Sequence, residues 1–203
     1  MAVSLFKYAS TLVALAAGLY ATLLGLLTTA TFQSQVIYLH AIQMTWISNY
    51  RALSAGDPRK IQVLTFDYRG FGSSTGTPSE SGLIIDALAV VDWAMNIASI
   101  PPSHILIFAQ SMGTAVGLAV SHHFALQSPP VVFADTVLVA PFVDVATLSA
   151  TSRVAGTIPI LSPLAKFPLL INYFEGYIRD KWLSKDRIEW YVRANEANGK
   201  RYR

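Results

Sequence analysis

Cysteine is absent from the 203 residues of this chain. Its absence excludes disulfide bonds, thiol catalysis and cysteine-based metal sites. No Asn-x-Ser/Thr sequon is present either, so glycosylation does not indicate the compartment. These two absences restrict the chemistry open to the chain and leave its location undecided.

Charged residues are scarce and unevenly placed. They make up 13% of the sequence, against roughly 25% in typical soluble domains, and none lies between Lys7 and Arg51. Tyr8–Leu27 is a run of twenty uncharged residues, and a helix of this length spans about 30 Å, the thickness of a hydrocarbon core. We therefore predict a single-pass membrane anchor within residues 1–30.

Two other interpretations of this apolar run stay open. The first is a cleaved signal peptide with an exit at Thr28-Thr29-Ala30, although the apolar core exceeds the usual signal length. The second is a buried core helix. Lys7 is the lone flanking positive charge, which favours a cytoplasmic N-terminus. The remainder would then face the lumen of the endoplasmic reticulum or the cell exterior.

Residues 31–60 are interpreted as a juxtamembrane linker. Thr31–Trp46 is apolar and aromatic and suits either a strand ending at His40 or a helix lying on the membrane.

Basic residues are in slight excess, with a formal net charge of +3. Eight of the fifteen Lys and Arg residues lie from Glu175 onward, where there are also five acids, a mixture typical of a solvated surface. Aromatic and basic residues do not interleave as in nucleic-acid-binding proteins. Thr75 stands where a dinucleotide fingerprint starting at Gly70 needs its third glycine, and no P-loop is present. We expect no nucleic acid, cofactor or metal.

The central segment, residues 61–145, predicts an α/β fold with a partial parallel sheet and flanking helices. Three short apolar runs rich in β-branched residues read as buried parallel strands; they are Ile61–Phe66, Ile105–Ala109 and Thr136–Ala140. Helical patterns separate them, as right-handed crossover connections require.

The first of these helices is predicted from Thr77 to about Ala98. Thr77-Pro78-Ser79-Glu80 resembles a capping box with proline at the first helical position. The residues at helical spacing that would face the sheet are Leu83, Ile84, Ala87, Leu88, Val91 and Met95. Asp86 and Asp92 are expected to be solvated.

The second strand leads into the most informative motif, Ala109-Gln110-Ser111-Met112-Gly113. A helical pattern follows over Thr114–Leu126. Strand, sharp turn and helix form the context of the G-x-S-x-G nucleophile elbow, which holds its serine at a strained apex. Ala109 replaces the first glycine, and small residues at 109 and 113 are expected to let strand and helix pass closely.

Three ordered motifs, FDYRGFGSSTGTPSE, AQSMGTAVGLA and LVAPF, resemble the α/β-hydrolase superfamily. They are most similar to membrane-anchored lipases that cleave monoacylglycerols and lysophosphatidylserine. The resemblance implies that Ser111 is the nucleophile toward a lipid or acyl-ester substrate. It also implies that the Met112 N–H is an oxyanion-hole donor, and that Asp67, Arg69 and Gly70 support the loop beside the site.

The family order of nucleophile, acid and histidine is not completed in an obvious way. His122 and His123 follow Ser111 by about three helical turns, some 16–18 Å, so neither is expected to reach its hydroxyl. Residues 38–41 can be read as a strand and His-Gly turn with Ala41 in place of glycine, but the linker interpretation is preferred. The chain is therefore expected to be truncated, internally shortened and inactive as it stands.

Residues 146–203 are predicted to form a cap-like and helical C-terminal segment. Ile158–Leu170 carries three prolines and suits either an acyl-binding groove or core packing. Helical charge spacing runs from Glu175 to Arg193. None of the later acids Asp144, Asp180 and Asp186 follows an obvious further strand.

Three functions remain open from the sequence. The first is a serine lipase or esterase, and the second is a pseudo-hydrolase or regulatory membrane protein. The third is an acyltransferase or peptidase built on the same elbow.

Overall fold

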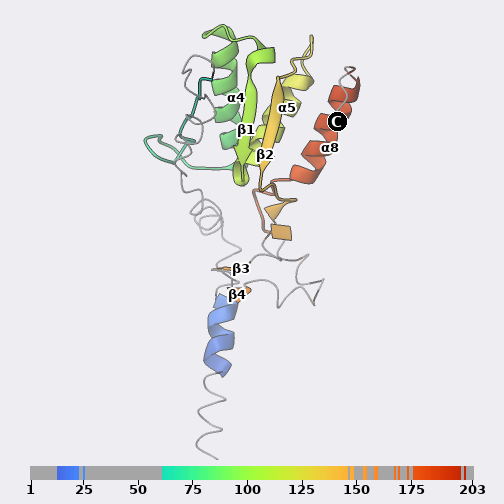
Figure 1. The fold of residues 1–203 in the computed structure, drawn as a ribbon. Coiled ribbons are helices and arrows are strands. Elements are labelled where there is room, and N and C mark those ends of the chain that lie inside the picture. The colour runs from blue at the N-terminus through green and yellow to red at the C-terminus, as the bar shows by residue number, and fades with distance from the viewer. Residues whose placement is uncertain are drawn as a thin grey trace, which may run out of the picture.

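The computed structural model describes residues 13–22, 25, 61–145, 147–148, 153–154, 158–159, 167, 169, 173, 176–197 and 199. Within them, two parallel strands and three long helices surround the elbow (Figure 1). Strand β1 is Leu106–Gln110 and β2 is Asp135–Val139, paired in parallel from Leu106 opposite Asp135 to Gln110 opposite Val139. The predicted α/β fold class is confirmed for this part of the chain.

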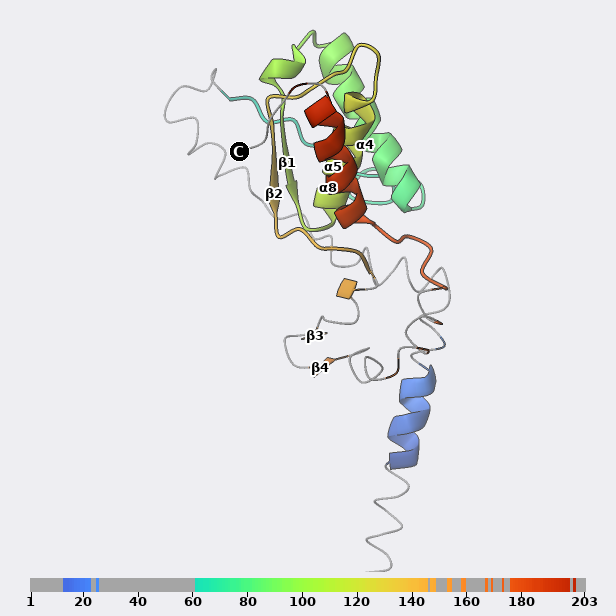
Figure 2. The same cartoon turned by 90° about the vertical axis from the view of Figure 1, so that its right-hand side faces the viewer.

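Helices α4 (Glu80–Asn96), α5 (Met112–Ala125) and α8 (Ser184–Ala197) lie on one side of the two strands (Figure 2). A short 3-10 turn, η1 (Pro102–His104), precedes β1. Two further short strands, β3 (Arg153–Val154) and β4 (Ile158–Pro159), pair antiparallel. The expected helix over Glu175–Arg193 is thus displaced, because residues 176–183 are not helical.

The hydrophobic core lies between the strands and the helices. Its buried members are Leu83, Ala87, Ala115, Val116, Val120, Phe124, Phe133, Val145 and Trp182. Leu88, Val91 and Met95 pack against it, so five of the six residues predicted on the apolar face of α4 are confirmed, whereas Ile84 is half-buried and outside this cluster. A second cluster of Leu118, Ala125 and Tyr191 joins α5 to α8.

The predicted strand over Ile61–Phe66 is wrong in the described structure. These residues are not assigned to a strand, and the side chains of Ile61, Val63 and Leu64 are 44–53% exposed. A parallel strand needs a hydrogen-bonded neighbour, and none of the described strands pairs with this segment. The apolar pattern alone therefore did not suffice to define a strand.

The other two predicted strands exist, but they are less buried than their composition suggested. Leu106, Phe108 and Val137 are 36–53% exposed, whereas Ala109 on the opposite face is buried beneath α5. Near-continuous apolar runs are typical of strands covered on both faces. The described helices cover one face of the two strands, so the other face is exposed among the described residues.

Helix α4 begins later than the capping-box prediction, which was wrong by two residues. Its N-cap is Ser79, whose hydroxyl accepts a hydrogen bond from the Gly82 N–H at 3.2 Å. Glu80 is therefore the first helical residue, and its carboxylate binds other partners. It accepts from the Trp182 N–H at 3.0 Å and pairs with Arg187.

The described residues include part of the predicted membrane segment. Residues 13–22 and 25 are helical, and Val13, Leu15 and Leu19 are 58–73% exposed. None of the helices within the described ranges has the length and apolar character needed to span a bilayer. The remaining residues of the predicted span, and all of the predicted linker 31–60, fall outside the described residues.

Candidate active site

Ser111 occupies the turn between β1 and α5. Its backbone has φ 51° and ψ −124°, a conformation that non-glycine residues rarely adopt and that costs about 1–3 kcal/mol. Its N–H donates to the Val139 carbonyl at 2.9 Å, and its carbonyl accepts from the Thr114 N–H at 2.9 Å and hydroxyl at 2.6 Å. Three hydrogen bonds hold the residue in place, and it is exposed.

The strand beside Ser111 ends in a similar way. Ala140, which follows the last residue of β2, has φ 51°. Because Gln110 lies opposite Val139, the next residues, Ser111 and Ala140, leave the sheet side by side. Nothing in the sequence around Ala140 indicated this positive φ, since alanine is not a residue that favours it.

Met112 is the first residue of α5, so its N–H has no acceptor within the helix. Among the described residues, no other group accepts this hydrogen bond either. The amide lies next to the Ser111 hydroxyl, at the positive end of the helix dipole. A carbonyl oxygen that acquires negative charge beside Ser111 would be stabilised there.

The two small residues of the motif differ in what they contact. Ala109 packs against Gly117, where an added Cβ would lie 3.1 Å from the Ala109 Cβ. An added Cβ at Gly113 would meet nothing within 4 Å. The close approach of strand and helix therefore depends on Gly117, one turn beyond the motif, and the expected role of Gly113 in it was wrong.

The loop over residues 67–79 is closed by its own polar groups. The Asp67 carboxylate accepts a hydrogen bond from the Ser73 N–H at 3.0 Å. The backbone carbonyl of Asp67 accepts a hydrogen bond from the Ser74 hydroxyl at 2.8 Å. Gly70 has φ 79°, and a Cβ there would lie 2.7 Å from Pro78 Cδ, so the turn requires glycine at this position.

Arg69 connects this loop to α4. Its guanidinium forms an ion pair with Asp86 at 2.6 Å, and its backbone N–H donates to the same carboxylate at 2.9 Å. The Arg69 side-chain hydrogen bonds lower the pKa of Asp86 despite partial burial of the carboxyl. The expectation that Asp86 is solvated was wrong, whereas Asp92 is exposed and accepts from Asn96 at 2.7 Å.

Tyr68, beside Arg69, packs against the core. Burial, the larger cause, and the negative charge of Asp86, the smaller, raise the pKa of its phenol to about 12. The ring meets Phe66 edge to face with 4.8 Å between centroids. This loop is thus anchored by an apolar contact as well as by the ion pair.

The described histidines lie away from Ser111. His122 is near the C-terminal end of α5, where its ring lies 5.9 Å from that of Trp190 on α8. Burial, and then the charges of His123 and Arg187, lower the pKa of His122. His104 belongs to η1, at the end of β1 opposite the elbow. His40 falls outside the described residues, so the general base is not among the groups the structure places beside Ser111.

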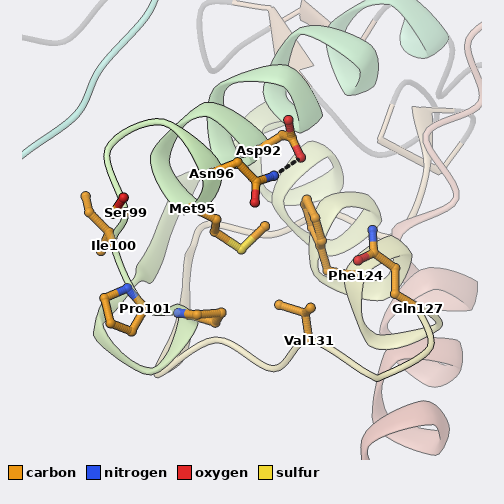
Figure 3. Close-up of a pocket in the computed structure, with 10 residues that line it drawn as sticks. Asp92, Met95, Asn96, Ser99, Ile100, Pro101, Phe124, Gln127 and Val131 are labelled. Carbon is orange, nitrogen blue, oxygen red and sulfur yellow. Dashed lines mark hydrogen bonds between the residues drawn. The ribbon is translucent and has the colours of Figure 1, made fainter.

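A hollow of about 430 Å³ lies at the far end of the helices (Figure 3). Met95, Phe124 and Val131 line its interior, with Asn96 and Gln127 among its polar lining residues. Phe124 is thirteen residues beyond Ser111, so about 20 Å of helix separates the hollow from the elbow. The hollow is not the cleft of the nucleophile.

The elbow geometry agrees with the comparisons with known proteins. The model of the alpha/beta hydrolase family matches residues 36–201. The chain belongs to this family. Its match begins within residues 31–60 and includes all of the described helices from α4 to α8.

Several curated relatives match about half of this chain. An uncharacterized protein of Mycobacterium tuberculosis is 40% identical over 90 residues, covering 44% of this chain and 30% of its own length. The human protein ABHD12B is 34% identical over 114 residues, covering 54% of this chain and 30% of its own.

The lysophosphatidylserine lipase ABHD12 of Macaca fascicularis is 38% identical over 92 residues, covering 43% of this chain and 22% of its own length. The chain thus spans less than a third of the length of these relatives. No solved structure matches it.

Proposed function

We propose that this chain carries the nucleophile half of a serine-dependent lipid ester hydrolase. The observation that carries the proposal is the backbone of Ser111, strained at φ 51° between a parallel strand and a helix N-terminus. Strain of this kind persists where surrounding contacts fix it, and it clusters at reactive sites. It exposes the hydroxyl at the carboxyl edge of the sheet, where ligands of α/β proteins bind.

The proposed reaction follows from these groups. The Ser111 Oγ attacks the ester carbonyl carbon while its proton passes to a general base, and the carbonyl oxygen becomes an oxyanion facing the Met112 N–H. Collapse breaks the bond to the alcohol, which leaves with a proton, and gives an acyl-enzyme. Water then releases the carboxylic acid and restores Ser111. Neither step calls for a cofactor.

The general base is the component that the described residues do not supply. His122 is held in the α5–α8 contact beside Trp190, and a serine without its base loses several orders of magnitude in rate. The second candidate function is therefore a non-catalytic protein that binds an acyl ester at the elbow without turning it over. An acyltransferase or peptidase would share the elbow and differ in its acceptor.

The substrate class is proposed from the relatives. One of them is named a lysophosphatidylserine lipase and is 38% identical to this chain over 92 residues. We propose a single-chain lipid ester presented at a membrane, with residues 1–30 as the anchor and the elbow on the lumenal or outer side. The apolar surface of residues 13–22 supports this arrangement, because Val13, Leu15 and Leu19 are exposed.

Turnover of defined esters tests the proposal. The full chain in detergent is given a monoacylglycerol, lysophosphatidylserine and a short-chain p-nitrophenyl ester, with Ser111→Ala as the matched control. Fatty acid release that disappears in Ser111→Ala supports the lipase. Binding of the lipid without release by either protein supports the non-catalytic alternative, and release that persists in Ser111→Ala contradicts the assignment of the nucleophile.

A further inference from the structure

Trp182, just before α8, adopts an unusual and fully enclosed position. Its side chain is 0% exposed, and its backbone has φ 49°. Left-handed backbone at a bulky aromatic residue is an outlier that surrounding contacts must hold in place. The Trp182 N–H donates to Glu80 at 3.0 Å, and its carbonyl accepts from the Ser184 N–H at 2.7 Å.

Arg187, in the first turn of α8, completes this arrangement. Its guanidinium pairs with Glu80, with side-chain exposures of 13% and 18%, and lies 5.9 Å from the centre of the Trp182 ring. A second arm of the guanidinium donates to the Ala115 carbonyl at 3.4 Å. We call Glu80, Trp182 and Arg187 the clamp.

The clamp reaches the elbow along two routes. Ala115 belongs to the first turn of α5, which begins directly after Ser111. On the other side, the loop that leaves β2 is tied to the clamp segment, since the Val143 carbonyl accepts from the Ser184 N–H at 2.9 Å. The same strand holds Ser111 through the Val139 carbonyl. The helix that follows the nucleophile is thus attached to this partly buried ion pair, and the loop that follows β2 is attached to the segment that carries Trp182.

We infer that Glu80 and Arg187 are positioning residues, which act on Ser111 through the first turn of α5. This inference rests on the proposed function for its link to catalysis. A planar guanidinium can span the Glu80 carboxylate and the Ala115 carbonyl in two directions, whereas a lysine ammonium is a compact point charge. Arg187→Lys should therefore keep the pair with Glu80 and lose the contact with α5.

The test compares Arg187→Lys with Arg193→Lys. Arg193 forms an ion pair with Glu189 on the same helix, but these side chains are 74% and 51% exposed and contact neither α4 nor α5 in the described interactions. The rate at which a fluorophosphonate labels Ser111 reports the reactivity of its hydroxyl. Hydrogen exchange of the amides of residues 114–116 measures the order of the first turn of α5 independently of chemistry.

For Arg187→Lys we expect labelling to slow by about tenfold or more and exchange at residues 114–116 to accelerate. Its melting temperature should stay within about 4 °C of the unmodified chain. Arg193→Lys should change neither rate. Unchanged exchange in Arg187→Lys would overturn the inference, as would labelling at the unmodified rate. Slower labelling of Arg187→Lys that is fully explained by a larger unfolded fraction of that variant would also overturn it.

The labelling and exchange measurements distinguish failure of the proposed function from failure of the positioning role. If the unmodified chain is not labelled at all, the hydrolase proposal fails, and the exchange measurement alone decides the clamp. Faster exchange at residues 114–116 in Arg187→Lys, with no change in Arg193→Lys, then still supports a positioning contact. Equal exchange in all three proteins refutes it.

Discussion

Ala109 of β1 lies directly against Gly117 of α5. A Cβ added at Gly117 would lie 3.1 Å from the Ala109 Cβ and 3.2 Å from Ile107 Cγ2. The alanine that replaces glycine in the elbow motif is thus accommodated by a glycine on the facing helix. This pairing sets how near α5 approaches the strand that carries Ser111.

Gly117→Ala is expected to destabilise the chain by about 1–3 kcal/mol, because the added methyl overpacks a strand–helix contact. Ala109→Gly in the same chain should recover part of this loss, because it removes the opposing methyl. Gly113→Ala is the matched control and should be neutral or stabilising by up to about 1 kcal/mol, since alanine favours helix. Denaturant unfolding followed by circular dichroism measures all four proteins.

The relative stabilities of these variants can also contradict the assigned contact. If Gly117→Ala and Gly113→Ala have the same stability, the close approach at residue 117 is not present in solution. If Ala109→Gly fails to improve Gly117→Ala, the strain lies against Ile107 instead.

The strained backbone of Ser111 leads to a second prediction. At φ 51°, glycine relieves strain that alanine retains. Ser111→Gly should therefore be more stable than Ser111→Ala by about 1 kcal/mol, even after the larger entropy of glycine in the unfolded chain is subtracted. Thermal unfolding of the two variants gives the comparison. A less stable glycine variant would mean that residue 111 does not occupy the elbow conformation.

The Arg69–Asp86 pair predicts an acid-sensitive loop. Hydrogen bonds from Arg69 lower the pKa of Asp86, so ionised Asp86 stabilises the folded chain above the usual carboxyl pKa of about 3.9. That contribution is lost as pH falls through the lower, folded-state value. Asp86→Asn should be less stable at pH 7, and the difference from the unmodified chain should shrink below about pH 4.

Unfolding free energies of both proteins across this range provide the measurement. A stability difference that does not change with pH would contradict the assigned ion pair. Asp92→Asn is the matched control on the same helix, because Asp92 is exposed and bonds to Asn96 alone among the described residues.

His122 should give a second pH dependence, at the α5–α8 contact. Burial, with the charges of His123 and Arg187, lowers its pKa, so the folded chain favours neutral imidazole. Stability is then fully present above the unfolded pKa of about 6.5 and falls as pH drops below it. His122→Gln should flatten the stability profile below about pH 6.5. A profile equally steep in His122→Gln would contradict this cause.

Local sequence patterns predicted the elbow and its neighbouring elements well. The strand before Ser111, the helix after it and the strand at Asp135–Val139 have short, continuous signals in the chain. The family also followed from these motifs, because their order and spacing are specific. The pattern at Ile61–Phe66 failed since strand formation depends on a hydrogen-bonded neighbour, which a single segment does not reveal.

The contacts of Glu80 show why the clamp was missed. Its carboxylate fits a capping box when the sequence is read locally, but in the structure it binds Arg187 and the Trp182 N–H, 107 and 102 residues away. Capping is a local interaction that a four-residue pattern can describe. An ion pair across such a separation depends on how α8 packs against α5, which no local pattern contains.

The nucleophile assignment is tested most directly by mapping fluorophosphonate labelling on the full chain by mass spectrometry. We expect a covalent adduct on Ser111, none in Ser111→Ala, and slower labelling when an acyl ester competes for the elbow. An adduct on another serine, or one that persists unchanged in Ser111→Ala, would contradict it.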